Sequence, residues 1–354
     1  MAALMDYLNR AVTDGASDLF IVAGGPVSEK LDGRICPISP EKVLPPQTSQ
    51  LISDLYALAD RPMEDYRRRG DDDFSFAVPS LARFRVNAYR QRGSLAAVVR
   101  VVSFDIPDWH ALHIPEQVIR LAGVAHGLVL VTGTAGSGKS TTQACIIDQI
   151  NKTRNCHIVT LEDPIEFLHR DQKSIISQRE IAIDTADYLS GLRACLRQAP
   201  DVILLGEMRD HETIRTAMTA AETGHLIIAT LHTRGAVNTI DRIIDTFPPA
   251  QQNQIRIQLS TVLHTVVSQQ LIPDLHGCLV PAYEIMHMNS AIRSMIRDRK
   301  TYQIDNAISA GGGEDMLTMD QSILSLYRGG QITLETALDH ADHPEQLRRR
   351  LGLR

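Results

Sequence analysis

A glycine-rich run in the middle of the chain fits the phosphate-loop pattern G-x-x-x-x-G-K-[ST] at every fixed position. The run and the residue after it are Gly133, Thr134, Ala135, Gly136, Ser137, Gly138, Lys139, Ser140 and Thr141. Backbone N–H groups in such a turn bind phosphate oxygens, and the positive end of a following helix adds to the attraction. We therefore expect these residues to bind ATP, with Lys139 on the β- and γ-phosphates and the Ser140 hydroxyl on Mg²⁺.

The flanks of the run agree with this interpretation. The apolar stretch 128–131 precedes it and predicts a buried strand, and the stretch 141–150 follows it and predicts a helix. A strand, a turn and a helix are the context that the motif requires. The alternative, a glycine-rich turn that binds nothing, does not explain why both flanks match.

Two acids follow predicted strands further along the chain. Glu162 comes after the stretch 157–161, where a carboxylate at the carboxyl end of a strand can polarise an attacking water. Glu207 comes after the apolar stretch 202–205, where the acid of a Walker-B strand stands. Gly206 occupies the position of the usual Asp, so Glu207 takes the acid role and is the second predicted Mg²⁺ ligand. The alternatives are a solvated loop for Glu162 and a plain strand-end acid for Glu207.

One histidine and three arginines complete the set of candidates. His232 ends the strand predicted over 226–230 and could hydrogen-bond the γ-phosphate, although a lone histidine is more often structural. His225 begins that strand, at the other edge of the sheet, and carries less weight. Arg83, Arg85 and Arg100 lie on predicted strands near the N-terminus. They are either surface residues or arginine fingers that complete a γ-phosphate site, and the spacing does not choose between these two roles.

Bulk composition excludes several classes of protein. A formal charge of −6 argues against a binder of duplex DNA that relies on a broad basic face. The five cysteines are scattered with no C-x-x-C pair, so we expect reduced thiols in a cytoplasmic protein and no structural zinc. No apolar run approaches the roughly 18 residues of a membrane-spanning helix. Any membrane association would then be peripheral, through partners.

The predicted elements divide the 354 residues into two domains of the α/β class. The first hundred residues read as a small α+β domain, with helices near 2–14 and 48–58, a short strand at 19–22, a hairpin signal at Asp32-Gly33, and strands near 74–78, 83–89 and 96–102. Residues 103–118 read as a linker. Strand–helix alternation from about 119 predicts a mainly parallel sheet with helices on both faces. From about 285 we expect a helical C-terminal region.

Four motifs together closely resemble the secretion-type ATPases, and more narrowly the type IV pilus retraction ATPases of the PilT/PilU group. They are the phosphate loop, Leu161–Phe167, Gly206–Asp210 and Ala220–Thr233. The resemblance covers nearly the whole chain, from Gly15–Leu19 to Ala291–Asp298. It implies a PAS-like domain over 1–102, a RecA-like ATPase domain over 119–354 and a ring-shaped homohexamer.

The resemblance also implies roles for individual residues. Glu162 to Glu166 match the Asp box of the family, Glu207 the Walker-B acid, and His225 and His232 the His box, whereas Arg85 and Arg100 match arginines that reach the nucleotide. Such a protein is a Mg²⁺-dependent ATPase motor at the cytoplasmic face of the inner membrane. It drives pilus retraction against a membrane platform protein, in some cases with a paralogous retraction ATPase.

Several positions depart from the pattern of the group. Thr134-Ala135 stand where Pro-Thr is usual, but neither supplies the lysine or the Mg²⁺ hydroxyl. Phe20 and Gln198-Ala199 favour one paralogue of the group, and Ala291–Asp298 favours the other. The open alternatives are an accessory ring subunit with little turnover of its own and a type IV secretion ATPase. The tetracysteine insert usual in assembly motors is absent from the sequence, and no aromatic-and-basic groove suggests a nucleic-acid translocase.

Overall fold

The structure is a computed structural model that describes residues 2–31, 33–102, 105–311 and 315–352. The chain divides into two compact units, one of Met1–Asp105 with Glu166–Leu168 and one of Ile106–Ile165 with His169–Arg354. Each unit contains its own β-sheet. Within the described residues, no helix is long and apolar enough to cross a membrane. The predicted linker 103–118 stays a prediction, and its residues 103–104 lie outside the described residues.

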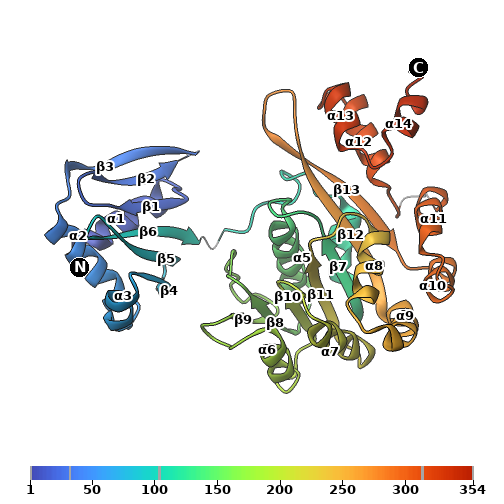
Figure 1. Ribbon diagram of the computed structural model, residues 1–354, viewed down its shortest axis with the longest axis horizontal. Coiled ribbons are helices and arrows are strands. Elements are labelled where there is room, and N and C mark those ends of the chain that lie inside the picture. Colours follow the sequence, from blue (N-terminus) through green and yellow to red (C-terminus); the bar gives the residue numbers. More distant parts are fainter. Residues whose placement is uncertain (1, 32, 103–104, 312–314, 353–354) are drawn as a thin grey trace. The chain divides into compact units, whose positions relative to one another are not determined.

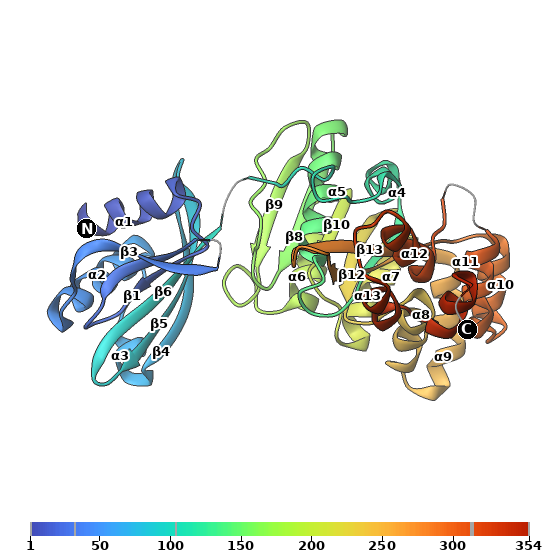
Figure 2. The ribbon, with the colours of Figure 1, turned by 90° about the horizontal axis from the view of Figure 1, so that it is seen from above.

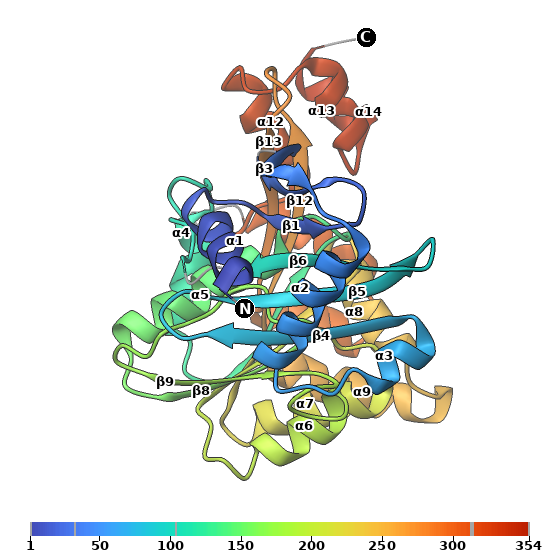
Figure 3. The same cartoon turned by 90° about the vertical axis from the view of Figure 1, so that its left-hand side faces the viewer.

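The first unit is an antiparallel sheet of six strands in the order β3-β2-β1-β6-β5-β4. The strands are β1 (Asp18–Ile21), β2 (Pro26–Leu31), β3 (Arg34–Lys42), β4 (Asp71–Val78), β5 (Ala82–Gln91) and β6 (Ser94–Val102). Helices α1 (Ala2–Thr13), α2 (Pro45–Leu58) and α3 (Glu64–Arg69) cover one face of this sheet (Figure 3). The hairpin predicted at Asp32-Gly33 joins β2 to β3, with Asp32 itself outside the described residues.

The alternation of buried and partly buried side chains along β5 shows which face of this sheet the helices cover. Phe84 and Val86 are fully buried in the core against the helices, whereas Arg83 and Arg85 alternate with them and are only partly buried. Because successive side chains of a strand point to opposite faces, the arginines lie on the face without helices. Each buried large side chain contributes roughly 1.5–3 kcal/mol to folding, so the register of β5 is strongly specified.

The second unit is a seven-stranded sheet in the order β13-β12-β7-β11-β10-β8-β9, drawn from green to orange in Figure 1. The strands are β7 (Gly127–Thr132), β8 (His157–Glu162), β9 (Ile175–Glu180), β10 (Val202–Leu205), β11 (Leu226–Leu231), β12 (Leu263–Pro273) and β13 (Leu279–His287). All neighbours pair parallel except β12 and β13, which form an antiparallel hairpin. The prediction of a mainly parallel sheet is confirmed.

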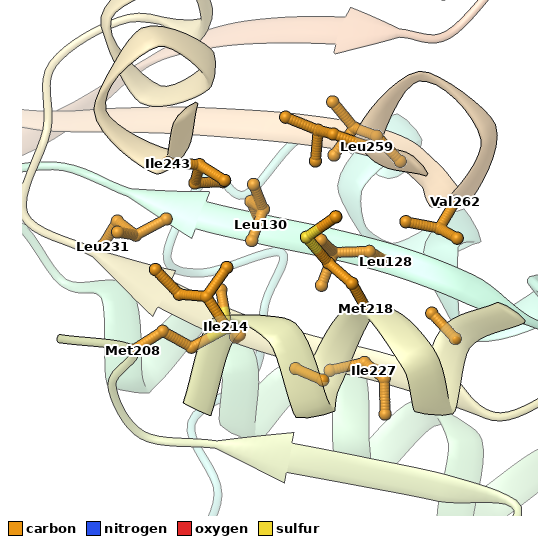
Figure 4. Packing of buried hydrophobic residues seen from close by; sticks show 14 of the residues in the cluster. Leu128, Leu130, Met208, Ile214, Met218, Ile227, Leu231, Ile243, Leu259 and Val262 are labelled. Carbon is orange, nitrogen blue, oxygen red and sulfur yellow. The ribbon is translucent and has the colours of Figure 1, made fainter. Parts of the chain in front are cut away.

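Helices cover both faces of this sheet, as Figure 2 shows. On one face lie α4 (Glu116–Ile119) and α5 (Lys139–Thr153); on the other lie α6 (Tyr188–Cys195), α7 (His211–Glu222), α8 (Ala236–Asp245) and α9 (Pro249–Val262). Strand β7 supplies both cores, because Leu128 and Leu130 face α7 to α9 whereas Val129 and Val131 face α5. Figure 4 shows the first of these cores. Burial on both faces explains why β7 reads as one apolar run.

The C-terminal part contains α10 (Ser290–Arg297), α11 (Ile304–Ala310), α12 (Met319–Arg328), α13 (Leu334–His340) and α14 (Pro344–Arg350). Residues of α12 to α14 form a separate small core with Ile272 of β12 and Ala282 of β13. The predicted start of this helical region near 285 is wrong by a few residues, because β13 continues to His287. The apolar stretch 279–287 pairs with β12 along its whole length, which a reading of local periodicity did not reveal.

Candidate nucleotide site

The predicted site residues of the second unit meet at one edge of its sheet. Strands β7, β8, β10 and β11 are parallel neighbours, so their carboxyl ends lie side by side. The phosphate loop follows β7, Glu162 ends β8, Glu207 follows β10 by two residues and His232 follows β11 directly. The fold therefore brings four sequence-predicted features to the edge where open α/β sheets bind ligands.

The phosphate loop depends on glycine where it passes β12. Gly138 has φ +86° and is the N-cap residue of α5, and a Cβ there would lie 2.8 Å from the Gln269 side-chain nitrogen. Gly133 has φ +145°, and a Cβ there would overlap the Gln269 carbonyl oxygen and approach the Ser137 hydroxyl. Only glycine adopts these dihedrals without strain and leaves this space. The loop consequently wraps closely over the N-terminus of α5.

Lys139 is the first residue of α5, and only 8% of it is exposed. Its ammonium group donates to the carbonyl oxygens of Gly133 at 3.0 Å and Thr134 at 2.8 Å. The hydroxyls of Ser137 and Thr132 are buried beside the loop without a hydrogen-bond partner in the described parts of the chain. An anion inside the loop would meet the Lys139 ammonium group and the N-terminus of α5.

Glu162 is held by two neighbours at the end of β8. Its Oε1 accepts a hydrogen bond from the Thr160 hydroxyl at 2.5 Å and another from the Gln178 side-chain amide at 3.2 Å. Gln178 lies on β9, which pairs with β8. The carboxylate is thus oriented by polar groups on two adjacent strands, as a group that positions a water must be.

Glu207 lies between two basic side chains. Its Oε1 is 2.6 Å from Arg209 Nε and 3.2 Å from His232 Nε2. Only 16% of the Glu207 side chain is exposed, against 76% for Arg209 and 50% for His232. The side-chain hydrogen bond from Arg209 to Glu207 raises the pKa of the guanidinium. The strand-end acid and the strand-end histidine are therefore in direct contact across β10 and β11.

A tyrosine packs behind the acids. A Cβ at Gly206 would lie 2.8 Å from the Tyr188 hydroxyl. Burial raises the pKa of that hydroxyl, and the charges of Asp163, Glu207 and Glu162 raise it further. Tyr188 thus stays a neutral phenol within the electrostatic reach of these three carboxylates. Its position also explains why glycine, and not the usual Asp, precedes Glu207.

The remaining candidates lie elsewhere. His225 precedes β11 at the opposite edge, where its Nδ1 is 3.0 Å from the Ala220 carbonyl oxygen near the end of α7. Arg85 and Arg100 belong to the first unit, where β5 and β6 place them directly opposite each other. Arg100 also pairs with Asp18 at 3.0 Å and is 64% exposed. Like charges directly opposite on neighbouring strands destabilise a sheet, and Asp18 offsets the charge of Arg100 in this pair.

Comparison with known proteins shows the family. The family model described as "Type II/IV secretion system protein" matches residues 1–326. The chain is 43% identical to the type IV pilus retraction ATPase PilT of Pseudomonas aeruginosa, over 97% of this chain and 99% of that protein. It is 37% identical to the type IV pilus ATPase PilU of the same organism, over 96% of this chain and 89% of that protein. This chain belongs to the type II/IV secretion ATPase family, in the group that contains PilT and PilU.

The fold of the group is the fold seen here. A crystal structure of the pilus retraction motor PilT with bound ADP matches this chain with a TM-score of 0.87 and 43% identity, covering 98% of each chain. The predicted fold class, an N-terminal α+β domain and a P-loop ATPase domain, is confirmed by this match. The sequence resemblance to the PilT/PilU group is confirmed as well.

Three residues that lie at the site of this protein were not among the predicted site residues. Arg209 belongs to the motif Gly206–Asp210, but the sequence does not show which way a side chain after a strand points. Tyr188 begins α6, whose start the Asp187 N-cap marks, but nothing local places it behind Gly206. Gln269 lies on β12, which was not predicted, so no signal in the sequence could have connected it to the phosphate loop.

Proposed function

We propose that this protein is a hexameric, Mg²⁺-dependent ATPase motor that drives type IV pilus retraction from the cytoplasmic face of the inner membrane. The observation that carries the proposal is the convergence of the phosphate loop, Glu162, Glu207 and His232 at one sheet edge, in a chain that is 43% identical to PilT over 97% of its length. A chain of this family without turnover would not need an intact set of strand-end acids.

Residues Gly133 to Thr141 hold the phosphates of ATP in this proposal. Lys139 exchanges the carbonyl oxygens of Gly133 and Thr134 for the β- and γ-phosphate oxygens, a stronger charge-assisted pairing. The partly buried Ser140 hydroxyl makes no hydrogen bond with any residue that the structure describes. It fits the role of the loop hydroxyl that binds Mg²⁺, together with Glu207, which carries the other predicted ligand oxygen.

Bound Mg²⁺ neutralises charge that develops on the phosphates. The protein itself supplies the other groups. Glu162, fixed by Thr160 and Gln178, orients and polarises the attacking water, and Glu207 supplies the strand-end acid. His232 Nε2 donates to the γ-phosphate when it leaves Glu207. These groups act by position and by charge, which is what phosphoryl transfer requires of a protein.

Arg85 and Arg100 complete the site in this proposal. They lie on the uncovered face of the first sheet, where a bound phosphate would relieve the repulsion between them. They act on the nucleotide of their own chain or of a neighbour in a homohexamer. Hydrolysis around such a ring would then work against a pilus platform protein of the inner membrane, with a paralogous retraction ATPase as a further partner. No role in binding nucleic acid follows from this arrangement.

Purified protein tests the enzymatic part of the proposal. We expect a hexamer in solution that hydrolyses ATP in the presence of Mg²⁺. Lys139→Ala should remove turnover, and Glu207→Gln should keep ATP binding while turnover falls by about 10²-fold or more. A wild-type protein whose turnover equals that of Lys139→Ala would contradict the assignment as a motor and favour the accessory ring subunit.

Surface pili on cells distinguish the direction of the motor. Loss of a retraction motor leaves assembly running, so cells that lack this protein should keep their pili and lose twitching motility. Cells that lack an assembly motor would have no pili. Complementation with the wild-type gene should restore motility, and complementation with Lys139→Ala should not. Bald mutant cells, or motile cells that carry only Lys139→Ala, would contradict retraction as the function.

A further inference from the structure

Arg209 is an exposed arginine whose guanidinium contacts the mostly buried carboxylate of Glu207. The Nε–Oε1 distance is 2.6 Å, and Arg209 is 76% exposed whereas Glu207 is 16% exposed. Isolated surface ion pairs contribute about 0–1 kcal/mol to stability, so this contact is not required to stabilise the fold. Charge-assisted hydrogen bonds to a carboxylate are, however, short and directional. The contact therefore controls where the carboxylate points more than how stable the fold is.

The backbone on both sides of Arg209 is fixed. The Met208 N–H donates to the Thr230 carbonyl oxygen at 3.2 Å. Asp210 caps α7, since its carboxylate accepts from the Thr213 N–H at 2.8 Å and from the Thr213 hydroxyl at 2.7 Å. The Thr230 hydroxyl also donates to the Gly206 carbonyl oxygen. Arg209 is thus presented to Glu207 from a rigid segment, which is the condition for one side chain to position another.

The two basic partners of Glu207 are not equivalent. Both approach Oε1, but His232 follows β11 and Arg209 follows β10 on the same short segment as Glu207. If His232 turns to the γ-phosphate, as the proposed function requires, Glu207 loses one of its two partners. A carboxylate that is mostly buried needs a remaining partner to keep one orientation. Of the two side chains that contact Glu207, Arg209 is the one that can provide it, because Arg209 and Glu207 lie on the same short segment after β10.

We propose that Arg209 is a positioning residue that holds the Glu207 carboxylate in its catalytic orientation while His232 contacts the nucleotide. The inference rests on the proposed function, in which Glu207 acts on bound ATP. It assigns Arg209 no contact with ATP. Two other roles compete with it: a direct phosphate ligand, and a surface ion pair without effect on the reaction. The three roles differ in which kinetic constant a substitution changes.

Steady-state kinetics of the full-length protein with Mg²⁺ and ATP separate these roles. We expect Arg209→Gln to lower kcat by about tenfold or more, with the KM for ATP changed by less than about twofold. Arg209→Lys keeps a cation near Glu207 and should recover a substantial part of kcat. Arg193→Gln is the matched control, because Arg193 is 57% exposed and pairs with the exposed Glu212 at 3.1 Å. The control should match the wild type in both constants.

Each other outcome overturns the inference. A kcat for Arg209→Gln within about twofold of the wild type would make Arg209 a surface ion pair. A raised KM with unchanged kcat would make it a phosphate ligand, as would loss of ATP binding in a titration with a non-hydrolysable analogue. Equal losses in Arg209→Gln and Arg209→Lys, with hexamer mass and melting temperature unchanged, would exclude a role for the positive charge. A wild-type protein without turnover contradicts the proposed function itself, a result distinct from all of these.

Discussion

The Thr142 hydroxyl of α5 donates a 2.7 Å hydrogen bond to the Gln269 side-chain oxygen of β12, and both residues are buried. The same side chain approaches Gly138, and the Gln269 carbonyl oxygen approaches Gly133. Gln269 of β12 therefore packs against both ends of the phosphate loop. The neighbouring Ser268 hydroxyl accepts a hydrogen bond from the Gly235 N–H at 2.9 Å. The other neighbour, Gln270, contacts His340 of α13. Strand β12 connects the loop, the segment after His232 and the C-terminal helices.

This contact predicts a non-additive pair of substitutions. Gln269→Leu leaves the buried Thr142 hydroxyl without its acceptor and should lower the free energy of unfolding by about 1–3 kcal/mol. Thr142→Val should have a similar effect by leaving the amide unpaired. The double variant removes both polar groups, so its loss should be clearly less than the sum of the single losses. Denaturant unfolding of the three variants measures this, and strictly additive losses would show that the bond contributes nothing.

The close approach of Gly206 and Tyr188 predicts that Tyr188→Phe partly rescues the defects of Gly206→Ala. A methyl group at position 206 would lie 2.8 Å from the Tyr188 hydroxyl and 3.3 Å from the Leu161 carbonyl oxygen. Gly206→Ala should therefore destabilise the protein by about 1–3 kcal/mol and lower turnover by displacing Glu207. Tyr188→Phe removes the hydroxyl and should restore part of both in the double variant. Thermal unfolding and ATP turnover of the four proteins test this, and a double variant no better than Gly206→Ala would contradict it.

The strands around the site could be predicted well from the sequence because each is a short run of apolar residues. Strand β7 was expected over 128–131 and extends over Gly127–Thr132, and β10 was expected over the four residues where it lies. Such strands are apolar throughout because helices cover both faces of the sheet. The motif residues that follow them then had only one edge of the sheet to occupy, so their meeting followed from topology alone.

Strand β12 was missed for the opposite reason. Its centre holds Ser268, Gln269 and Gln270, which are 1–6% exposed yet polar, because they hydrogen-bond to other parts of the second unit. A polar run breaks the apolar pattern from which a buried strand is recognised. The contact of Arg209 with Glu207 was missed because the side-chain conformation of Arg209, and not its spacing in the sequence, determines which residue it contacts. Both failures fall on residues whose contacts with distant parts of the chain override the local pattern.

Glu284 of β13 predicts a dependence of stability on pH. It is 5% exposed, and its Oε1 accepts a hydrogen bond from the Ala236 N–H at 2.7 Å. Burial raises its pKa from 4.5 to about 7, and the charges of Asp342 and Asp305 add to this effect. The folded protein thus holds this proton more tightly than the unfolded chain. The resulting stabilisation is complete below about pH 4.5 and is lost as the pH rises through about 7.

Glu284→Gln should remove this dependence, because an amide oxygen still accepts from Ala236 and carries no titrating proton. Between pH 5 and pH 8, the wild type should lose free energy of unfolding relative to Glu284→Gln, by at most on the order of 3 kcal/mol. Denaturant unfolding at several pH values measures the difference, with the exposed Glu335→Gln as the control. A difference that grows in the opposite direction would mean that the folded protein favours the charged form of Glu284.

Arg85 tests whether the first unit takes part in hydrolysis. It is partly buried on β5 and lies directly opposite Arg100, which Asp18 already pairs. If Arg85 stabilises charge that develops on the γ-phosphate, Arg85→Ala should lower kcat by about 10²-fold or more and leave the affinity for ATP nearly unchanged. Its removal should not destabilise the sheet, because it relieves the repulsion with Arg100.

Arg90→Ala is the matched control, since Arg90 is an exposed arginine on the same strand but on the opposite face. It should keep wild-type turnover and wild-type stability. Mixing inactive Lys139→Ala chains with Arg85→Ala chains extends the test. If the arginine acts on a neighbour's nucleotide, some mixed hexamers contain an interface with one intact loop and one intact arginine, and turnover should exceed that of either variant alone. An Arg85→Ala variant with the wild-type rate would return Arg85 to an ordinary surface position.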